Sequence, residues 1–364
     1  MSPAPTLLYV EVPHFYAAIE RRNNPEMGSR PLIVGGDPRK RGQVQSASPD
    51  ALESGVELGM SMLEALDRCP QARALRTDMK RYREVSGQLR ALLRTEVEQL
   101  ESAGLDAAFL DATHDPRSGE ELAEVLCRRV REELGLEVRV GIAAVKFLAR
   151  VAASESGGRA VTRVAAGREA EFLSELPTSV LPGVGPKTLI TLRELGAKCV
   201  GDLLRVDRAV LEDALGNHGL RILELAQGQD GQPVRSACAP RTLSQEYTFE
   251  TAQLDLVVLE ERLQRLAVGL ENALRRQGLG ARRIAVKVRY ADHESTTRTR
   301  TLDRSVALAA DLADTARTLL GRTHAGSRAI RTIGIHLGEL DPGRGDTRQL
   351  ELFGAVVDDG PSQA

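Results

Sequence analysis

The stretch Leu7–Glu20, LLYVEVPHFYAAIE, decides how this chain is interpreted. Residues 7–12 are apolar except for Glu11, a pattern typical of a strand that is covered on both faces. Pro13 suits the first turn of a helix, and residues 15–19 place apolar side chains at helical spacing. An ionised carboxylate is very costly to bury without a partner. Glu11 must therefore face a cleft, pair with a cation in the core, or hold a metal.

The composition is that of an ordinary globular protein with more than one domain. The chain has 364 residues, of which 42% are hydrophobic and 27% are charged. A net charge of −2 neither requires nor excludes nucleic acid, because local charge matters more than the sum. Aromatic residues make up 3% and tryptophan is absent, which argues against binding single strands by base stacking.

Cysteine spacing and hydropathy predict a cytoplasmic protein. The four cysteines lie far apart without a C-x-x-C pair, which argues against zinc and disulfides and favours a reducing compartment. The N-terminus lacks a basic segment followed by a long apolar one, and no run reaches 18 apolar residues. We therefore expect neither a signal peptide nor a membrane partner.

Strand and helix patterns divide the chain into several domains. Helical spacing covers residues 82–100 and 118–134, where Ser118 and Glu121 suit a capping box, and strand patterns cover 7–12, 104–113, 136–142 and 160–164. This order predicts a ferredoxin-like α/β domain in residues 1–27 and 77–169, with Glu11 and Asp106 on neighbouring strands. Further segments are predicted at 28–76, 170–235 (helical), 243–340 (α/β) and 341–364 (disordered tail), with a linker at 236–242.

Residues 181–204 have a helix–hairpin–helix pattern. Gly183 and Gly185 lie in a tight turn, and Lys187 and Thr188 follow in the first turn of a helix. Glycines allow a close approach of the backbone, and amides at a helix start can bind a phosphate. The pattern predicts a sequence-independent contact with a DNA backbone; the alternative is a purely structural helical hairpin.

A second basic region lies between Arg275 and Arg304. It holds nine basic and three acidic residues, a net charge of +6 in a nearly neutral chain. This concentration predicts a sheet that follows DNA phosphates, and the alternative is a solvated strand face. The candidate DNA-binding residues are Arg282, Arg283, Lys287, Arg289, Arg298 and Arg300.

The polar tail contains one apolar island, QLELF, at residues 349–353. Because such a peptide has no core to join, we interpret it as a docking motif. Gln349 would bond a pocket rim while Leu350, Leu352 and Phe353 fill an apolar slot. The alternative is a cluster that packs back on its own domain.

Together these segments resemble the Y-family translesion DNA polymerases over about residues 5–340. The matching motifs, in family order, are LLYVEVPHFYAAIE, RPLIVGG, the segment 46–62, GLDAAFLDAT, VGIAAVKFLARVAAS, the hairpin, GQDGQPV, SQEYTF and IRTIGIHLGEL. The resemblance implies a right-hand polymerase with a ferredoxin-like palm, small fingers, a helix–hairpin–helix thumb and an α/β little finger. QLELF resembles the peptide by which such bacterial proteins bind the sliding clamp.

The resemblance implies a site that has lost catalytic groups. The family holds two magnesium ions with three carboxylates; Glu11 and Asp106 match two of them, whereas Pro13 and Ala107 occupy other acidic positions. Tyr16 matches the residue that screens the incoming nucleotide's sugar. The positions that grip the triphosphate in the family are Pro49, Leu52 and Gly157–Gly158 here.

Three hypotheses follow from this resemblance. The first is a catalytically degraded, ImuB-like adaptor in damage-induced mutagenesis, which binds damaged DNA and the sliding clamp and brings another DNA polymerase, with a recombinase as a further partner. The second is an active translesion polymerase with a remodelled magnesium site at Glu11, Asp106 and Asp111. The third is a DNA-binding repair factor without a polymerase partner.

Overall fold

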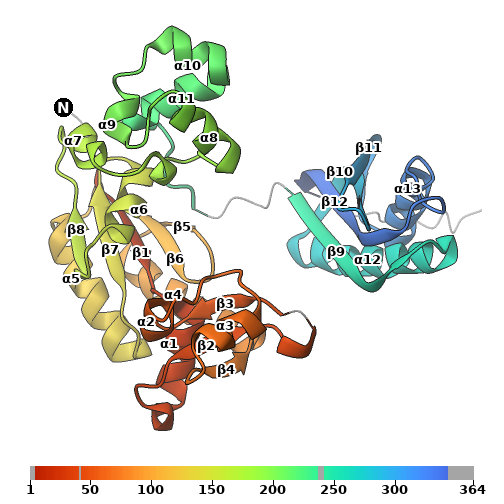
Figure 1. Ribbon diagram of the computed structural model, residues 1–364, viewed down its shortest axis with the longest axis horizontal. Coiled ribbons are helices and arrows are strands. Elements are labelled where there is room, and N and C mark those ends of the chain that lie inside the picture. The colour runs from red at the N-terminus through yellow and green to blue at the C-terminus, as the bar shows by residue number, and fades with distance from the viewer. Residues whose placement is uncertain (1–4, 41, 237–241, 343–364) are drawn as a thin grey trace, which may run out of the picture. The chain divides into compact units, whose positions relative to one another are not determined.

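Strand β1 (Leu7–Glu11) lies at the centre of a five-stranded sheet in a computed structural model that describes residues 5–40, 42–236 and 242–342 (Figure 1). The chain divides into two units, residues 1–237 and 238–364, each with its own hydrophobic core. Helix α1 (Phe15–Asn23) follows β1 directly, which confirms the predicted strand, turn and helix.

The sheet around β1 has the order β5-β6-β1-β7-β8. Only the β7–β8 pair is parallel; the other neighbours are antiparallel. Its other strands are β5 (Gln99–Ser102), β6 (Ala107–Asp111), β7 (Arg139–Ala143) and β8 (Val161–Arg163).

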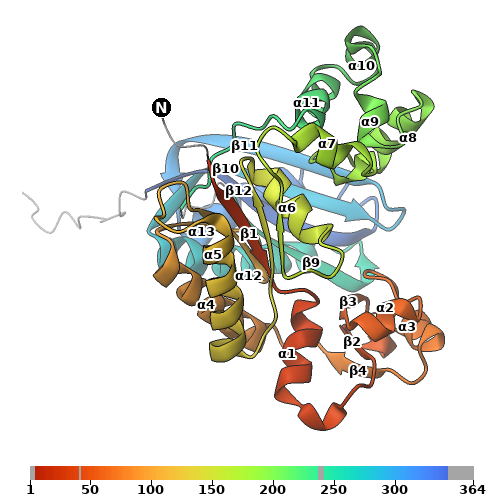
Figure 2. The same ribbon diagram turned by 90° about the vertical axis from the view of Figure 1, so that its left-hand side faces the viewer.

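Helices cover both faces of this sheet (Figure 2). On one face, α4 (Met79–Glu96) and α5 (Gly119–Arg129) pack in the same core as Leu8 and Val10 of β1. On the other face, α6 (Lys146–Ser154) packs in the core that contains Tyr9. A Cβ atom at Gly141 of β7 would lie 1.9 Å from the Ala149 carbonyl oxygen, so α6 can approach the strand only because this residue is glycine.

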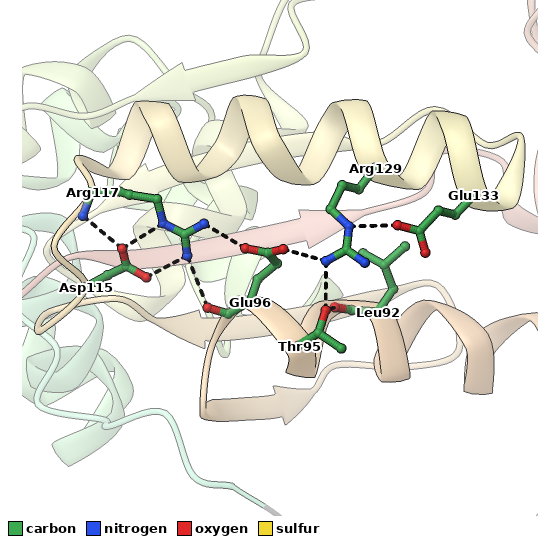
Figure 3. Close-up of polar contacts among 7 residues, drawn as sticks. All are labelled: Leu92, Thr95, Glu96, Asp115, Arg117, Arg129 and Glu133. Carbon is green, nitrogen blue, oxygen red and sulfur yellow. Dashed lines mark hydrogen bonds and ion pairs between the residues drawn. The ribbon is translucent and has the colours of Figure 1, made fainter.

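An ion-pair network joins the end of α4 to α5 (Figure 3). Glu96 accepts a hydrogen bond from Arg117 at 2.7 Å and another from Arg129, and Arg117 also donates to Asp115 at 2.9 Å. The hydrogen bond from Arg117 is the main reason why the pKa of Glu96 is lowered. The predicted capping box of Ser118 and Glu121 is confirmed at the start of α5. The turns of this helix continue as a π-helix, η3 (Val130–Leu134).

The expected helix over residues 82–100 is too long at its C-terminal end. Helix α4 ends at Glu96, and Val97 has extended backbone angles (φ −140°, ψ 133°) that lead into β5. Val97 and Leu100 are both buried. Because short apolar runs fit either a helix or a strand, their periodicity did not reveal the change.

A smaller sheet, with the order β3-β2-β4, follows α1. Ile33, Met62 and Cys69 belong to its separate core. Its elements are β2 (Leu32–Gly35), β3 (Val44–Ala47), β4 (Arg73–Arg76), α2 (Pro49–Glu53), α3 (Met62–Arg68) and the 3-10 turns η1 (Pro25–Met27) and η2 (Pro38–Lys40).

The last part of the first unit is helical. Leu192, Leu203 and Ile222 are fully buried in the core that it shares with α6. Its elements are α7 (Glu169–Ser174), η4 (Thr178–Val180), α8 (Pro186–Glu194), α9 (Val200–Leu203), α10 (Arg208–Leu215) and α11 (Asn217–Ala226).

The second unit is a four-stranded antiparallel sheet with two helices on one face. The strand order is β11-β10-β12-β9, and the strands are β9 (Thr242–Gln253), β10 (Leu279–Tyr290), β11 (Ser295–Val306) and β12 (Ile330–Pro342). Helices α12 (Leu256–Gln277) and α13 (Ala309–Leu320) share the core of this unit. Strand β12 extends two residues into the segment expected to be a tail. No helix in the described ranges is long and apolar enough to cross a membrane.

Candidate functional site

Glu11 lies at the end of β1, between two strands that approach it from either side. Its direct partners in the sheet are Ala107 of β6 and Arg139 of β7. Asp106 immediately precedes β6, and its carbonyl accepts a 2.9 Å hydrogen bond from the Val12 amide. The predicted proximity of Glu11 and Asp106 is therefore confirmed, whereas their catalytic role stays a prediction.

Burial and neighbouring charges set the protonation of Glu11. Burial is the main reason why the pKa of Glu11 is raised, and the charge of Asp106 raises it further. Arg139 and a hydrogen bond from the Tyr9 hydroxyl oppose this increase. Burial, followed by the charge of Glu11, raises the pKa of Tyr9. Among the cations near Glu11, Arg139 on the neighbouring strand lowers its pKa the most.

The side chains around Glu11 do not fit a two-metal centre. Pro13 and Ala107 have no side-chain oxygen, and the described part of the chain contains no group of three or more His, Cys, Asp or Glu residues arranged to hold a metal ion. The positive charge of Arg139 also opposes a second cation beside Glu11. Binding of a single Mg²⁺ by Glu11 and Asp106 stays a prediction.

Tyr16 and Asp106 line the same cavity of about 250 Å³, together with Gln45 and Leu58. The ring of Tyr16 stacks on Tyr82, with 4.2 Å between the centroids and 10° between the planes. The Tyr82 hydroxyl in turn donates a 2.8 Å hydrogen bond to the buried carboxylate of Glu20. This chain of contacts holds Tyr16 in place at the cavity wall, and its contact with a nucleotide stays a prediction.

His14 also lines a larger cavity of about 680 Å³. His14 precedes α1 with a left-handed backbone (φ 54°), and burial is the main reason why its pKa is lowered. Pro13, Pro49 and Gly158 also line this cavity. Five arginines surround it: Arg21, Arg22, Arg131, Arg139 and Arg159.

Sequence reasoning did not identify these arginines. Arg139 lies between the buried residues Val138 and Val140 in an alternating pattern, so a polar residue in this strand was visible in the sequence. Its position opposite Glu11 depends on the register of β1 against β7. No local pattern specifies that register, because the two strands lie far apart in the chain.

The predicted hairpin has a tight glycine turn that leads into α8. Gly183 has a φ of +88°, and a Cβ atom there would lie 2.9 Å from the ring of His218. Gly185 is the N-cap residue of α8, which has no side-chain cap, and Lys187 and Thr188 belong to the first turn. Lys187 is exposed. This geometry suits a phosphate contact, which stays a prediction.

The six basic residues predicted on the second sheet do not share one face. Directly paired residues of neighbouring strands point to the same side of a sheet. The open face holds Arg283, Lys287 and Arg289, whose partners on β11 are Thr301, Thr297 and Ser295.

Arg298 and Arg300 lie on the opposite face of this sheet, because they pair with the buried residues Val286 and Ile284. Arg298 donates a 2.9 Å hydrogen bond to the carbonyl of Arg322, which follows α13. Arg282 lies at a bulge between Ala281 and Arg283. Strand alternation therefore separates Arg298 and Arg300 from the three basic residues of the open face, and the DNA contacts of all six residues stay predictions.

The predicted clamp-binding residues Gln349, Leu350, Leu352 and Phe353 lie outside the described residues. Their role stays a prediction that depends on sequence alone.

Comparison with known proteins identifies the family. Residues 10–154 match the impB/mucB/samB family and residues 240–352 match its C-terminal domain. A DNA polymerase IV of Halorhodospira halophila is 35% identical over 354 residues, covering 96% of this chain and 99% of that protein.

Solved structures give the same answer for the fold. A Y-family DNA polymerase chimera has a TM-score of 0.82 at 24% identity and covers 93% of this chain and 100% of its own, which shows the fold alone. An insertion ternary complex of Dbh DNA polymerase has a TM-score of 0.71 at 26% identity and covers 92% of this chain and 98% of its own. The predicted right-hand polymerase fold is thereby confirmed, and the chain belongs to the impB/mucB/samB family of Y-family DNA polymerases.

Proposed function

We propose that this chain is a DNA-binding, non-catalytic Y-family protein that acts as an ImuB-like adaptor in translesion synthesis. One observation carries the proposal: Glu11 lies between Ala107 and Arg139 in the sheet. Where the resemblance calls for a further carboxylate there is the methyl group of Ala107, and the partner of Glu11 on β7 is the cation Arg139.

The chemistry of phosphoryl transfer explains why this arrangement argues against catalysis. Two-metal polymerases stabilise the attacking and leaving oxygens with ions held by carboxylates. They also neutralise the transferring phosphates with fixed cations. Here the positions matched to those cations and to the fingers' tyrosine are Pro49, Leu52 and Gly157–Gly158, none of which carries a charge.

The adaptor would act through two DNA-binding surfaces and one clamp-binding peptide. Lys187 and the amides at the start of α8 would contact one part of a primer–template, and the basic open face of the second sheet would contact another. Residues 349–353 would bind the sliding clamp. The protein would then bring an active polymerase, with a recombinase as a further partner, to damaged DNA in the cytoplasm.

Primer extension by the purified full chain tests this proposal. We expect no template-directed extension with Mg²⁺ or Mn²⁺ and all four deoxynucleotides, while fluorescence anisotropy on the same preparation shows DNA binding. An active polymerase on the same primer–template is the positive control. Extension that disappears in the double variant Glu11→Ala, Asp106→Ala would overturn the adaptor function.

Clamp binding has its own test. The double variant Leu352→Ala, Phe353→Ala is expected to lose affinity for the sliding clamp, because truncating apolar anchors removes most of the energy of such contacts. Replacing Val356 and Val357, which lie just outside the motif, is the matched control. If the parent chain, the Leu352→Ala, Phe353→Ala variant and the control variant all bound the clamp with equal affinity, this assignment would be contradicted.

A second candidate function is an active translesion polymerase with a remodelled magnesium site. The observation that favours it is the similarity to DNA polymerase IV relatives over almost the whole chain, together with the cavity that Tyr16 shares with Asp106. The same primer-extension experiment decides between the two. A third candidate, a repair factor without a polymerase partner, gains if capture from damaged cells returns DNA and no polymerase.

A further inference from the structure

A carboxylate lies within the basic open face of the second sheet. The strand registers place rows of directly paired residues on this face, from the row of Arg283 to the row of Arg289. Glu246 of β9 is the one acid in these rows, whose other members are Arg, Lys, His, Ser, Thr, Ala or Gly. Because a negative charge repels the phosphates that such a face would bind, the position of Glu246 requires an explanation.

The side chain of Glu246 crosses a glycine to reach a lysine two strands away. In the register of the sheet, Glu246 of β9 pairs with Gly334 of β12, and Gly334 pairs with Lys287 of β10. A Cβ atom at Gly334 would lie 2.5 Å from the Cγ atom of Glu246. The carboxylate side chain therefore occupies space that any larger residue on the middle strand would fill.

Two basic side chains lie next to this carboxylate. Lys287 donates a hydrogen bond from its Nζ atom to the Oε1 atom of Glu246 at 3.4 Å. The Nε2 atom of His336 lies 3.0 Å from the same oxygen. The side chains of Lys287 and Glu246 are 37% and 39% exposed, so both can be reached from solvent. The charge of Lys287 is therefore already partly neutralised before any DNA is bound.

Glu246 and Lys287 face the same small hollow in the sheet surface. This hollow of about 90 Å³ is also lined by Thr248, Arg289 and Thr332. The hydroxyl oxygens of Thr248 and Thr332 are 3.1 Å apart. A phosphate oxygen in the hollow would therefore have donors on several sides, but it would also meet the negative charge of Glu246.

We propose that Glu246 regulates DNA binding by the open face, because it competes with a DNA phosphate for Lys287. A phosphate that contacts Lys287 must displace the carboxylate that already accepts its hydrogen bond. Glu246 thus acts as a built-in counter-ion that keeps binding by this face weak and readily reversed. The inference rests on the proposed function, since it requires the open face to contact DNA.

Fluorescence anisotropy of the full chain with a primer–template over a salt series tests the proposal. We expect Glu246→Gln to bind DNA more tightly than the parent, because it releases Lys287. The slope of log affinity against log salt should become steeper by about 0.9, the value for one added phosphate contact, which is about threefold in affinity for a fourfold change of salt. Because an exposed ion pair contributes little to stability, the variant should unfold in urea close to the parent.

Two further proteins show whether the effect acts through Lys287. Glu261→Gln removes the same charge from an exposed ion pair on α12, on the helix-covered side of this sheet, and should leave the slope unchanged. In a Lys287→Gln background, Glu246→Gln should also leave the slope unchanged, because no lysine is released. The parent with Lys287→Gln alone is the reference for this second comparison.

Three results would overturn this inference. The first is an unchanged slope in Glu246→Gln while Arg283→Gln with Arg289→Gln weakens binding, and it leaves the open-face interface intact. The second is an equal change of slope in Glu261→Gln or in the Lys287→Gln background, which would mean that only overall charge matters. The third is DNA binding that no open-face variant alters, which overturns the interface as well. Primer extension by the parent overturns only the adaptor function.

Discussion

At the scale of the residue, Glu11 shows how one side chain acquires its chemistry from neighbours that are distant in sequence. It was recognisable as the one acid in an apolar strand. Its pKa is raised by burial and by Asp106, while Arg139 on the next strand opposes the increase. The carboxyl group of Glu11 therefore binds its proton more tightly in the folded chain than in the unfolded chain.

This preference predicts a stability that depends on pH. Because the folded pKa of Glu11 is raised, the ionised form destabilises the fold, and that cost grows as pH rises through the unfolded pKa. Glu11→Gln should therefore increase the free energy of unfolding at pH 7 in urea titrations. The gain should vanish below about pH 4, near the ordinary pKa of glutamate, where Glu11 is protonated in both states.

Glu96→Gln is the control, because it should change the free energy of unfolding in the opposite direction. The pKa of Glu96 is lowered by its hydrogen bond from Arg117, so its stabilisation is present above the unfolded pKa and is lost as pH falls through the folded pKa. Its substitution should reduce the free energy of unfolding by about 1.5–3 kcal/mol at pH 7, the usual contribution of a hydrogen bond to a charged group. A destabilised Glu11→Gln protein at pH 7 would contradict the assignment of burial as the main cause.

At the scale of the element, the contact between α6 and β7 depends on one glycine. The strand β7 was recognisable from its alternation, and α6 from its apolar spacing. No local pattern indicated that the helix backbone would lie directly on Gly141. Contact between two backbones is a tertiary property, because it requires the helix to return across the strand that precedes it.

Gly141→Ala should therefore destabilise the first unit strongly. Its Cβ would meet the backbone of Ala149 at 1.9 Å and of Ala153 at 2.5 Å, and backbone atoms cannot rotate away. We expect a loss of about 3 kcal/mol or more in urea unfolding, at or above the upper end of overpacking costs.

The matched control is Gly87→Ala, in the middle of α4, where a Cβ would have nothing within 4 Å. It should stabilise the protein by about 0.5–1 kcal/mol, because alanine favours a helix interior over glycine. If Gly141→Ala were as well tolerated as Gly87→Ala, the described packing of α6 on β7 would be wrong.

At the scale of the whole molecule, two units with separate cores carry different candidate DNA contacts. The hairpin belongs to the first unit and the basic sheet to the second. Within the basic sheet, strand alternation leaves Arg283, Lys287 and Arg289 on the open face and places Arg298 and Arg300 on the other.

This division predicts unequal effects on DNA binding. In the full chain, Arg283→Gln with Arg289→Gln should weaken binding to duplex DNA and reduce the slope of log affinity against log salt by about 1.8, as expected for two lost phosphate contacts. Arg298→Gln with Arg300→Gln removes the same charge and should change the slope little. Fluorescence anisotropy over a salt series measures both, and equal slopes in the two double variants would contradict the open-face interface.

The sequence by itself determined most strands and helices around Glu11, the family and the candidate acids, but not β3, β4 or β5. These depend on local periodicity, capping residues and ordered motifs, which are properties of short stretches of chain. The sequence did not predict that α4 ends at Glu96, because the residues that follow fit either a helix or a strand.

Tertiary structure alone decided what surrounds Glu11 and which arginines share a face. Pairing of β1 with β7 places Arg139 beside Glu11, and pairing of β10 with β11 separates Arg283 from Arg300. A shift of one residue in either register would reverse the side on which these residues lie. Register is fixed by packing between distant segments, and that packing places an arginine beside Glu11, whose role as a metal ligand stays a prediction.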